Sequence, residues 1–307
     1  MDILFQFIYE LPKEELYAFA NSQFFSSIVG ALAGAFAGAI AAHRIGSNAR
    51  KREDIELELR SVNLAISAAF LTCNSMLGMK NQHIREMYEN FASEKERYVQ
   101  TMQNPPQGGQ PIQFDTDLKT LHMPFVPFDD AIQNIQDRIS INGRPLALLS
   151  AIANSLNTLR SSLEYRNKLI EEFKTLFPNI RGQETLNYYF GMPLANGSVN
   201  HEYSDTLVGI YQYTDDVIYF SSLLCSDLNK YGEELRNFYV KKYRRKIRKI
   251  TRPDFNTEKA QGLMPSHDNY SDWLTMFQPH DEERSWFQRI FSPNKASKKD
   301  AHERASS

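Results

Sequence analysis

The sequence predicts an all-α protein in which an N-terminal transmembrane helix, or a two-helix hairpin, leads into a bundle of long helices with coiled-coil-like seams. Three observations support this class. A charge-free apolar stretch occupies residues 24–42. Farther along, three long stretches carry apolar residues spaced alternately three and four positions apart, which is typical of helices that pack along a seam. Proline and glycine gather between those stretches, at 104–128 and 179–200, where they interrupt helices.

The apolar stretch is predicted to form a transmembrane helix at 24–43. Residues 24–42 read FFSSIVGALAGAFAGAIAA, and a helix of this length is about 28 Å long, close to the thickness of the hydrocarbon core of a bilayer. Small residues recur at every fourth position, so they lie on one face and permit close contact between membrane helices. They are Ser26, Gly30, Gly34, Gly38 and Ala42. This stripe predicts a homo-oligomer in the membrane; a passive single anchor and a buried Ala/Gly-rich core helix remain alternatives.

The charges around this stretch predict its orientation. Residues 1–23 form a short amphipathic segment with more acidic than basic residues, whereas Arg44, Arg50, Lys51 and Arg52 follow the apolar stretch. This order is that of an uncleaved anchor rather than a signal peptide. The positive-inside rule therefore places the chain from residue 44 onward in the cytoplasm, with the N-terminus on the other side of the membrane. The N-terminal segment either lies at the membrane surface or packs on the rest of the protein.

Residues 44–103 are predicted to form a basic juxtamembrane tract that continues into a long helix. Its seam residues are Ile55, Leu59, Val62, Ile66, Ala69, Cys73 and Met76. Residues 61–79 are also free of charge, so a second transmembrane segment, and a hairpin with 24–42, is an alternative. In the hairpin, residues from 80 onward would lie outside the cytoplasm. Several polar residues within 61–79 favour the bundle helix, because unpaired polar groups are costly in lipid.

The rest of the chain up to residue 250 is predicted to consist of helices and the loops that connect them. A Pro/Gly-rich loop at 104–128 carries apolar residues that are expected to pack onto the helices, and a helical bundle at 129–250 follows. The last long helix of this bundle is expected to run from about residue 201 to residue 250, with the most regular seam in the chain. A loose C-terminal region at 251–307 is expected to end in a disordered tail.

No local pattern of catalytic or metal-binding residues is present in the sequence. Phosphate-binding loops, HExxH, GxSxG and paired CxxC motifs are missing, and the two cysteines lie far apart. The adjacent pairs Asp129-Asp130 and Asp215-Asp216 point about 100° apart on a helix, so neither pair converges on one atom. We interpret the first pair as a helix start and the second as a solvated face. His201 and Asp205 lie one turn apart, and a helix N-terminus explains them better than a metal site. We expect a non-enzymatic protein without cofactor or metal.

A dense basic run, KKYRRKIRK, closes the last long helix. Its cations are Lys241, Lys242, Arg244, Arg245, Lys246, Arg248 and Lys249. Three interpretations remain open: a contact for nucleic acid or an acidic partner, a lipid-binding juxtamembrane segment, or a solvated helix end. If the three long helices alternate in direction, the last one leads away from the membrane. The run would then lie on the order of 60–70 Å from the bilayer, which disfavours the lipid interpretation.

The layout of one membrane segment and a helical body resembles the membrane effectors of bacterial anti-phage systems, such as the transmembrane proteins encoded beside retrons. The resemblance is one of architecture and transfers no functional residue. It implies a partner, a reverse transcriptase with its nucleic acid, that residues 241–249 would contact. The leading functional hypothesis is therefore a non-enzymatic effector that self-associates, perturbs the inner membrane and is held in check by a partner. A passive membrane-anchored scaffold that recruits a protein or nucleic acid, and an enzyme with a non-local active site, are the alternatives.

Overall fold

The computed structural model describes residues 23–105, 112–178 and 182–276. Within these ranges the regular structure is helical and contains no strand, which confirms the predicted all-α class. The elements are α3 (Gln23–Met79), the π-helical turn η1 (Lys80–Ile84), α4 (Arg85–Gln103), α5 (Phe128–Arg138), α6 (Arg144–Leu176), α7 (Gln183–Phe190), α8 (Glu202–Tyr243), α9 (Glu258–Gln261), the 3-10 turn η2 (His267–Tyr270) and α10 (Ser271–Thr275). The expected N-terminal segment and C-terminal tail lie outside the described residues.

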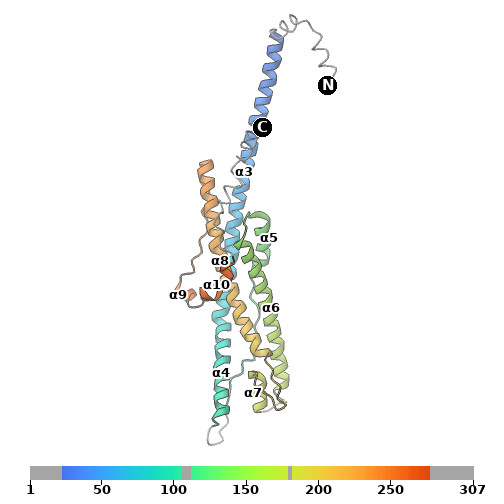
Figure 1. Cartoon of the computed structure of the whole chain (residues 1–307), viewed down its shortest axis with the longest axis vertical. Coiled ribbons are helices and arrows are strands. Elements are labelled where there is room, and N and C mark those ends of the chain that lie inside the picture. The colour runs from blue at the N-terminus through green and yellow to red at the C-terminus, as the bar shows by residue number, and fades with distance from the viewer. Residues whose placement is uncertain (1–22, 106–111, 179–181, 277–307) are drawn as a thin grey trace, which may run out of the picture.

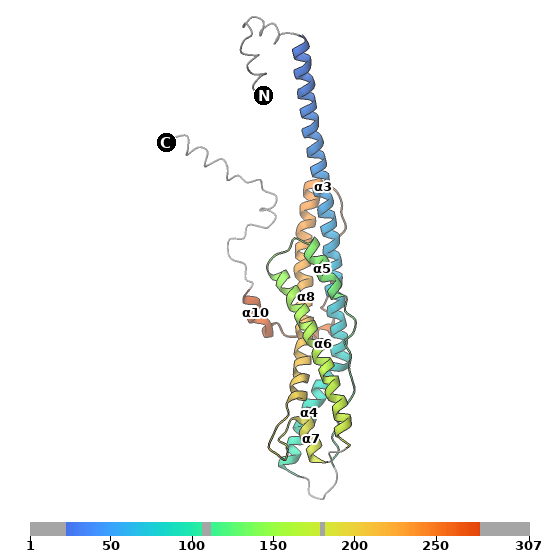
Figure 2. The same ribbon diagram turned by 90° about the vertical axis from the view of Figure 1, so that its right-hand side faces the viewer.

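The long N-terminal helix dominates the molecule. From Gln23 to Gln103 the chain is continuously helical through α3, η1 and α4, a length of about 120 Å. The N-terminal half of α3 projects beyond all other described elements, and the C-terminal half lies in the bundle (Figures 1 and 2). The alternative of a hairpin between 24–42 and 61–79 does not occur, because no turn separates the two segments and one face of 61–79 is buried in the bundle.

The core forms where α8 packs between α3 and α6. All seven predicted seam residues of α3 are buried, and so are the residues of α6 that carry the alternating spacing predicted for the second long stretch, Leu149, Ile152, Leu156, Leu159 and Leu163. Helices α3 and α8 run antiparallel and approach closely: the Cys73 Sγ lies 3.6 Å from the carbonyl oxygen of Ile218. At Gly232 of α8, a Cβ atom would lie only 2.9 Å from a methyl group of Val62. Small residues thus set the spacing of these two helices.

An extended segment decides the direction of the helices that follow it. After α4, residues 112–127 run without helix back along the bundle to α5, which packs on α3 (Figure 1). Along this path the Leu121 amide and carbonyl both bond the side chain of Asn167 in α6. The apolar residues of the segment pack on the core as expected, except for Ile112 and Phe125, which are exposed. Because the chain returns before α6 begins, α6 leads away from the projecting end of α3 and α8 leads back to it, opposite to the expected direction.

The C-terminal part of the described chain also differs from expectation. Helix α8 ends at Tyr243 rather than at residue 250, and Arg244 adopts the left-handed conformation, with φ 52°. Residues 244–251 then run back along α3, where Asn63 bonds the Lys249 carbonyl and the Thr251 amide. Residues 251–276, which we expected to be loose, pack on the bundle through short helices and the buried Leu263.

Candidate membrane interface

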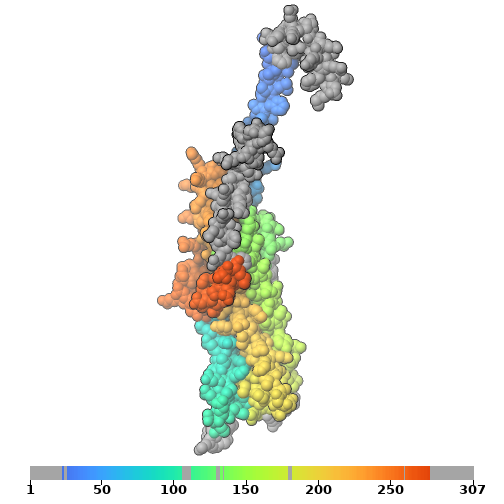
Figure 3. Space-filling view, viewed as in Figure 1, coloured from blue at the N-terminus to red at the C-terminus, as the bar shows by residue number. Residues whose placement is uncertain are grey.

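The projecting half of α3 has the properties of a membrane-spanning helix. By length and composition it is apolar enough to cross a bilayer. No residue of its most apolar stretch is buried in the protein. In Figure 3 its blue part stands clear of the bundle. Large apolar side chains are exposed along it to between 40 and 68 %, namely Ile28, Val29, Leu32, Phe36 and Ile40. The neighbours in this half of the helix must therefore come from outside the described chain.

The predicted stripe of small residues lies on this projecting half. Ser26 and Ala42 are exposed, and a Cβ atom added to Gly30, Gly34 or Gly38 would meet no other atom within 4 Å. The contrast with Gly232, where an added Cβ would meet α3, is direct. The stripe is thus sterically open along its whole length for a second helix.

The basic run at 241–249 lies at the end of the bundle from which the apolar helix projects. The Tyr239 hydroxyl donates a hydrogen bond to Glu56 in α3. Burial raises the pKa of Tyr243, and the neighbouring cations Lys51 and Arg52 partly offset this rise. Figures 1 and 2 both place the orange end of α8 beside α3 where α3 leaves the bundle. The expectation that the run lies far from the membrane segment is wrong, because the extended segment 112–127 adds one more crossing of the bundle.

The run is not one continuous helical face. Lys241 and Lys242 belong to the last turn of α8, whereas Arg244 is the left-handed residue that ends the helix, and the cations after it lie in chain without regular structure. Arg248 and Ile247 lie against Leu59 of α3 and its neighbours, farther from the projecting end. All seven cations are exposed. The tightest cluster of charge therefore surrounds the end of α8, beside Lys51.

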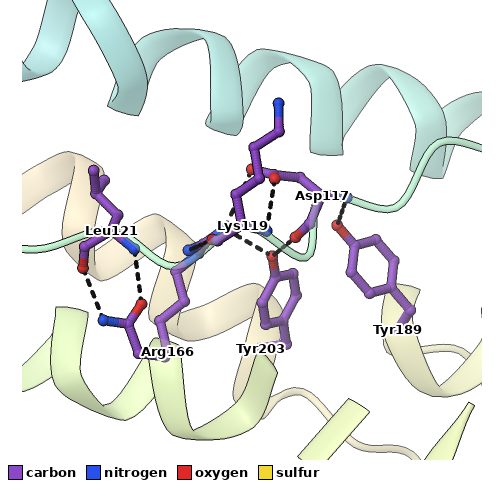
Figure 4. A network of polar contacts seen from close by, with 7 residues as sticks. Asp117, Lys119, Leu121, Arg166, Tyr189 and Tyr203 are labelled. Carbon is purple, nitrogen blue, oxygen red and sulfur yellow. Dashed lines mark hydrogen bonds and ion pairs between the residues drawn. The ribbon is translucent and has the colours of Figure 1, made fainter. Parts of the chain in front are cut away.

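A second polar centre, which the sequence analysis did not predict, lies where the extended segment meets α6 and α8 (Figure 4). Arg166 of α6 is completely buried. Its guanidinium donates to the Lys119 carbonyl at 2.7 Å, to Asp117 at 3.3 Å and to the Tyr203 hydroxyl at 3.4 Å. The Tyr189 hydroxyl accepts from the Asp117 amide at 3.1 Å. These bonds join the extended segment 112–127 to α6, α7 and α8.

The apolar spacing of α6 could have predicted that Arg166 is buried. Three residues beyond the predicted seam residue Leu163 is position 166, and Ile170 and Phe173 continue the same spacing. An arginine at a seam position must be buried, and a buried charge needs acceptors. The sequence did not reveal that the acceptors come from an extended segment some 47 residues earlier in the chain.

A cleft of about 580 Å³ lies beside this centre, between the extended segment and the π-helical turn η1. Its walls include His83, Glu86, Asp117 and Arg166. Burial raises the pKa values of Tyr189 and Tyr203, so both hydroxyls stay protonated at neutral pH. Because the guanidinium already donates to three acceptors, we interpret this polar centre as a structural link that holds the extended segment on the bundle.

The acidic pair of α8 diverges as predicted but is not a solvated face. Asp215 forms an ion pair with the buried Lys80 of η1, and Asp216 accepts a hydrogen bond from Tyr270 at 3.0 Å. Burial raises the pKa of both carboxyl groups, against the opposite effect of their donors. The side chains of the other pair, at 129–130, lie outside those that the structure describes.

His201 is the N-cap of α8, and no group of three metal-ligating side chains assembles among the described residues. Comparison of the chain with protein-family models, with curated proteins and with solved structures finds no match.

Proposed function

We propose that this protein is a membrane effector without enzymatic activity, which inserts α3 into the bacterial inner membrane and assembles there into oligomers that perturb the bilayer. The observation that carries the proposal is the projecting apolar half of α3. Burying the exposed part of five large apolar side chains such as Ile28 and Phe36 is worth about 5 kcal/mol in total. A helix that exposes them to water would associate or insert, and its length fits a bilayer.

The charge distribution supports a cytoplasmic bundle. Arg44, Arg50 and Lys51 follow the apolar stretch, and the fold adds the basic end of α8 on the same side. Cations near the end of a membrane helix favour the cytoplasmic side. A reporter enzyme that is active only in the cytoplasm should therefore be active when it is fused after residue 100. Activity of a reporter that works only in the periplasm would contradict this orientation.

The way in which α3 packs inside the bundle supports self-association. Ala65, Ala69 and Cys73 are buried where α3 meets α8. In the projecting half, Gly30, Gly34 and Gly38 would allow an even closer approach, yet no described element contacts them. A second copy of this helix supplies the missing neighbour in the proposal.

We also propose that a partner holds this effector in check. The resemblance to anti-phage membrane effectors supports a reverse transcriptase with its nucleic acid as that partner. A reverse transcriptase gene beside the gene for this protein would support this assignment, and its absence from the neighbourhood would count against it.

Expression of the chain alone tests the effector function. We expect slowed growth and loss of membrane potential, measured with a potential-sensitive dye, because unrestrained helices would assemble. Gly34→Leu and Gly38→Leu should relieve both effects by blocking close approach. Ala39→Leu is the matched control, because position 39 lies on the other side of the helix, and it should stay toxic.

A wild-type chain that inserts but leaves growth and potential unchanged would contradict the effector function. In that case a passive membrane-anchored scaffold becomes the better interpretation, and replacement of residues 24–42 by polyleucine should then leave its function intact.

A further inference from the structure

We propose that the end of the bundle binds the phosphate headgroups of anionic lipids through a basic collar, defined as the cations around the end of α8. Its members are Arg50 and Lys51 of α3 with Lys241, Lys242, Arg244, Arg245 and Lys246. The inference rests on the proposed insertion of α3 into the membrane and deepens it. It assigns to the basic run a partner that the sequence analysis disfavoured.

The antiparallel register of α3 and α8 places the collar. Val62 lies against Gly232, and Glu56 accepts a hydrogen bond from Tyr239, one turn before the end of α8. Tyr243, at the end, is close enough to Lys51 for the cation to influence its pKa. The last turn of α8 is therefore level with Lys51.

The collar lies within reach of the membrane surface. Lys51 follows Ala42 by nine residues, a rise of about 14 Å along α3. The headgroup layer outside the hydrocarbon core occupies about 5–8 Å of this distance. The remaining gap is comparable to the length of an extended lysine or arginine side chain and to the Debye length of about 8 Å at physiological salt.

The charge of the collar is available to a ligand. Within the described chain, no carboxylate forms an ion pair with Lys241, Arg244, Arg245 or Lys246. The nearby Glu56 accepts from Tyr239 and pairs with Arg52 at 3.7 Å. These four cations are therefore not neutralised by an ion pair at the side of the bundle that faces the bilayer.

The chain reversal at Arg244 concentrates this charge. Arg244 is the one non-glycine residue with positive φ in the described chain, and it turns the backbone away from the axis of α8. Arg245 and Lys246 therefore remain beside the helix end instead of extending past it. Cations here also interact favourably with the last carbonyl groups of α8, which point toward the membrane.

The position of the collar favours lipid over nucleic acid. A nucleic acid at the collar would lie against an anionic bilayer surface and would be repelled by it. Lipid phosphates, in contrast, are fixed at this level by the membrane itself. Each cation near such a surface contributes about 1 kcal/mol, which corresponds to about fivefold in partitioning.

Lipid retention by the full-length protein tests the proposal. The chain is reconstituted in vesicles of phosphatidylcholine and phosphatidylglycerol, purified in mild detergent at low salt, and its retained lipids are measured by mass spectrometry. We expect phosphatidylglycerol to be enriched at least threefold over its share in the vesicles, and high salt to remove the enrichment because the charges are exposed.

Matched charge variants locate the effect. The triple variant Lys241→Gln, Arg245→Gln and Lys246→Gln should lower the enrichment at least threefold. The control removes the same charge from exposed lysines far from the projecting end; its substitutions are Lys119→Gln, Lys168→Gln and Lys174→Gln. The control should retain the enrichment, and equal loss in both triple variants would overturn the proposal.

Alkaline extraction of the same vesicles separates this inference from the proposed function. If the chain resists alkaline extraction but retains the two lipids in the same ratio as in the vesicles, this result overturns the lipid site and leaves the insertion of α3 intact. A chain that is extracted from the vesicles overturns insertion, and the lipid site with it. Binding of a labelled single-stranded oligonucleotide that depends on the collar, without enrichment of phosphatidylglycerol, would assign the collar to nucleic acid and also overturn the proposal.

Discussion

The projecting half of α3 and its bundle half are both rich in small residues, but only the bundle half has neighbours. Between Ser26 and Gly46 the described side chains are exposed, whereas between Ile55 and Met79 one face is buried against α8. The same continuous helix thus passes from an environment without partners to one of close packing. Small residues in the bundle half of this helix therefore lie in an occupied contact face, whereas those of the projecting half lie on an open one.

The spacing of the residues that mark these faces differs between the two halves of α3 as well. The apolar seam residues of the bundle half alternate spacings of three and four, which matches the gentle crossing of coiled-coil-like packing. The stripe of the projecting half repeats every four residues, as in right-handed GxxxG packing. We therefore expect α3 to cross its copy in the membrane at a steeper angle than it crosses α8.

The largest expected loss lies in the bundle, at Arg166. Replacing Arg166 by alanine removes a fully buried cation and leaves the Oδ2 atom of Asp117 and the Lys119 carbonyl without the guanidinium donor. We expect the free energy of unfolding to fall by about 3 kcal/mol in denaturant titrations. Lys168→Ala on an exposed face of the same helix should change it by less than about 0.5 kcal/mol. If Arg166→Ala lowers the free energy of unfolding no more than Lys168→Ala does, the polar centre does not hold the extended segment on the bundle.

A pair of leucine substitutions compares the two halves of α3 directly. Ala69→Leu places extra volume into the closed contact with α8 and should lower the free energy of unfolding by about 1–3 kcal/mol. Gly34→Leu meets open space and should leave the melting temperature of the bundle unchanged while it weakens association of the membrane helices. Circular dichroism and crosslinking in vesicles measure the two effects. Equal melting temperatures for the two variants would break the comparison.

The smallest expected effect concerns pH. Because burial raises the pKa of Asp216, the folded chain holds this proton more tightly than the unfolded chain does. The ionised carboxylate therefore costs stability above the raised pKa, and the cost vanishes below its ordinary value of 3.8. Asp216→Asn keeps an acceptor for Tyr270, so it should add less than about 1 kcal/mol at pH 7 and nothing near pH 3.8. Stabilisation that persists at the acidic end would contradict this assignment.

Apolar periodicity was sufficient to predict the helical class and the buried faces. The seam residues of α3 and α6 are buried where the alternating spacing placed them, because a helix that packs against a neighbour needs one apolar face. The helix at 24–42 was equally predictable, because its length and lack of charge are those of a helix that could cross a bilayer. The two halves of α3 could thus be distinguished by composition before any contact was known.

Only the tertiary structure decided where the basic run and Arg166 lie. Periodicity reports which face of a helix is buried, but it carries no information on the partner or on the direction of the chain. The extended segment 112–127 has no helical period, yet it reverses the direction of α6 and α8 and supplies the acceptors for Arg166. Its return along the bundle brings residues 241–246 beside Lys51, at the end from which the apolar helix projects.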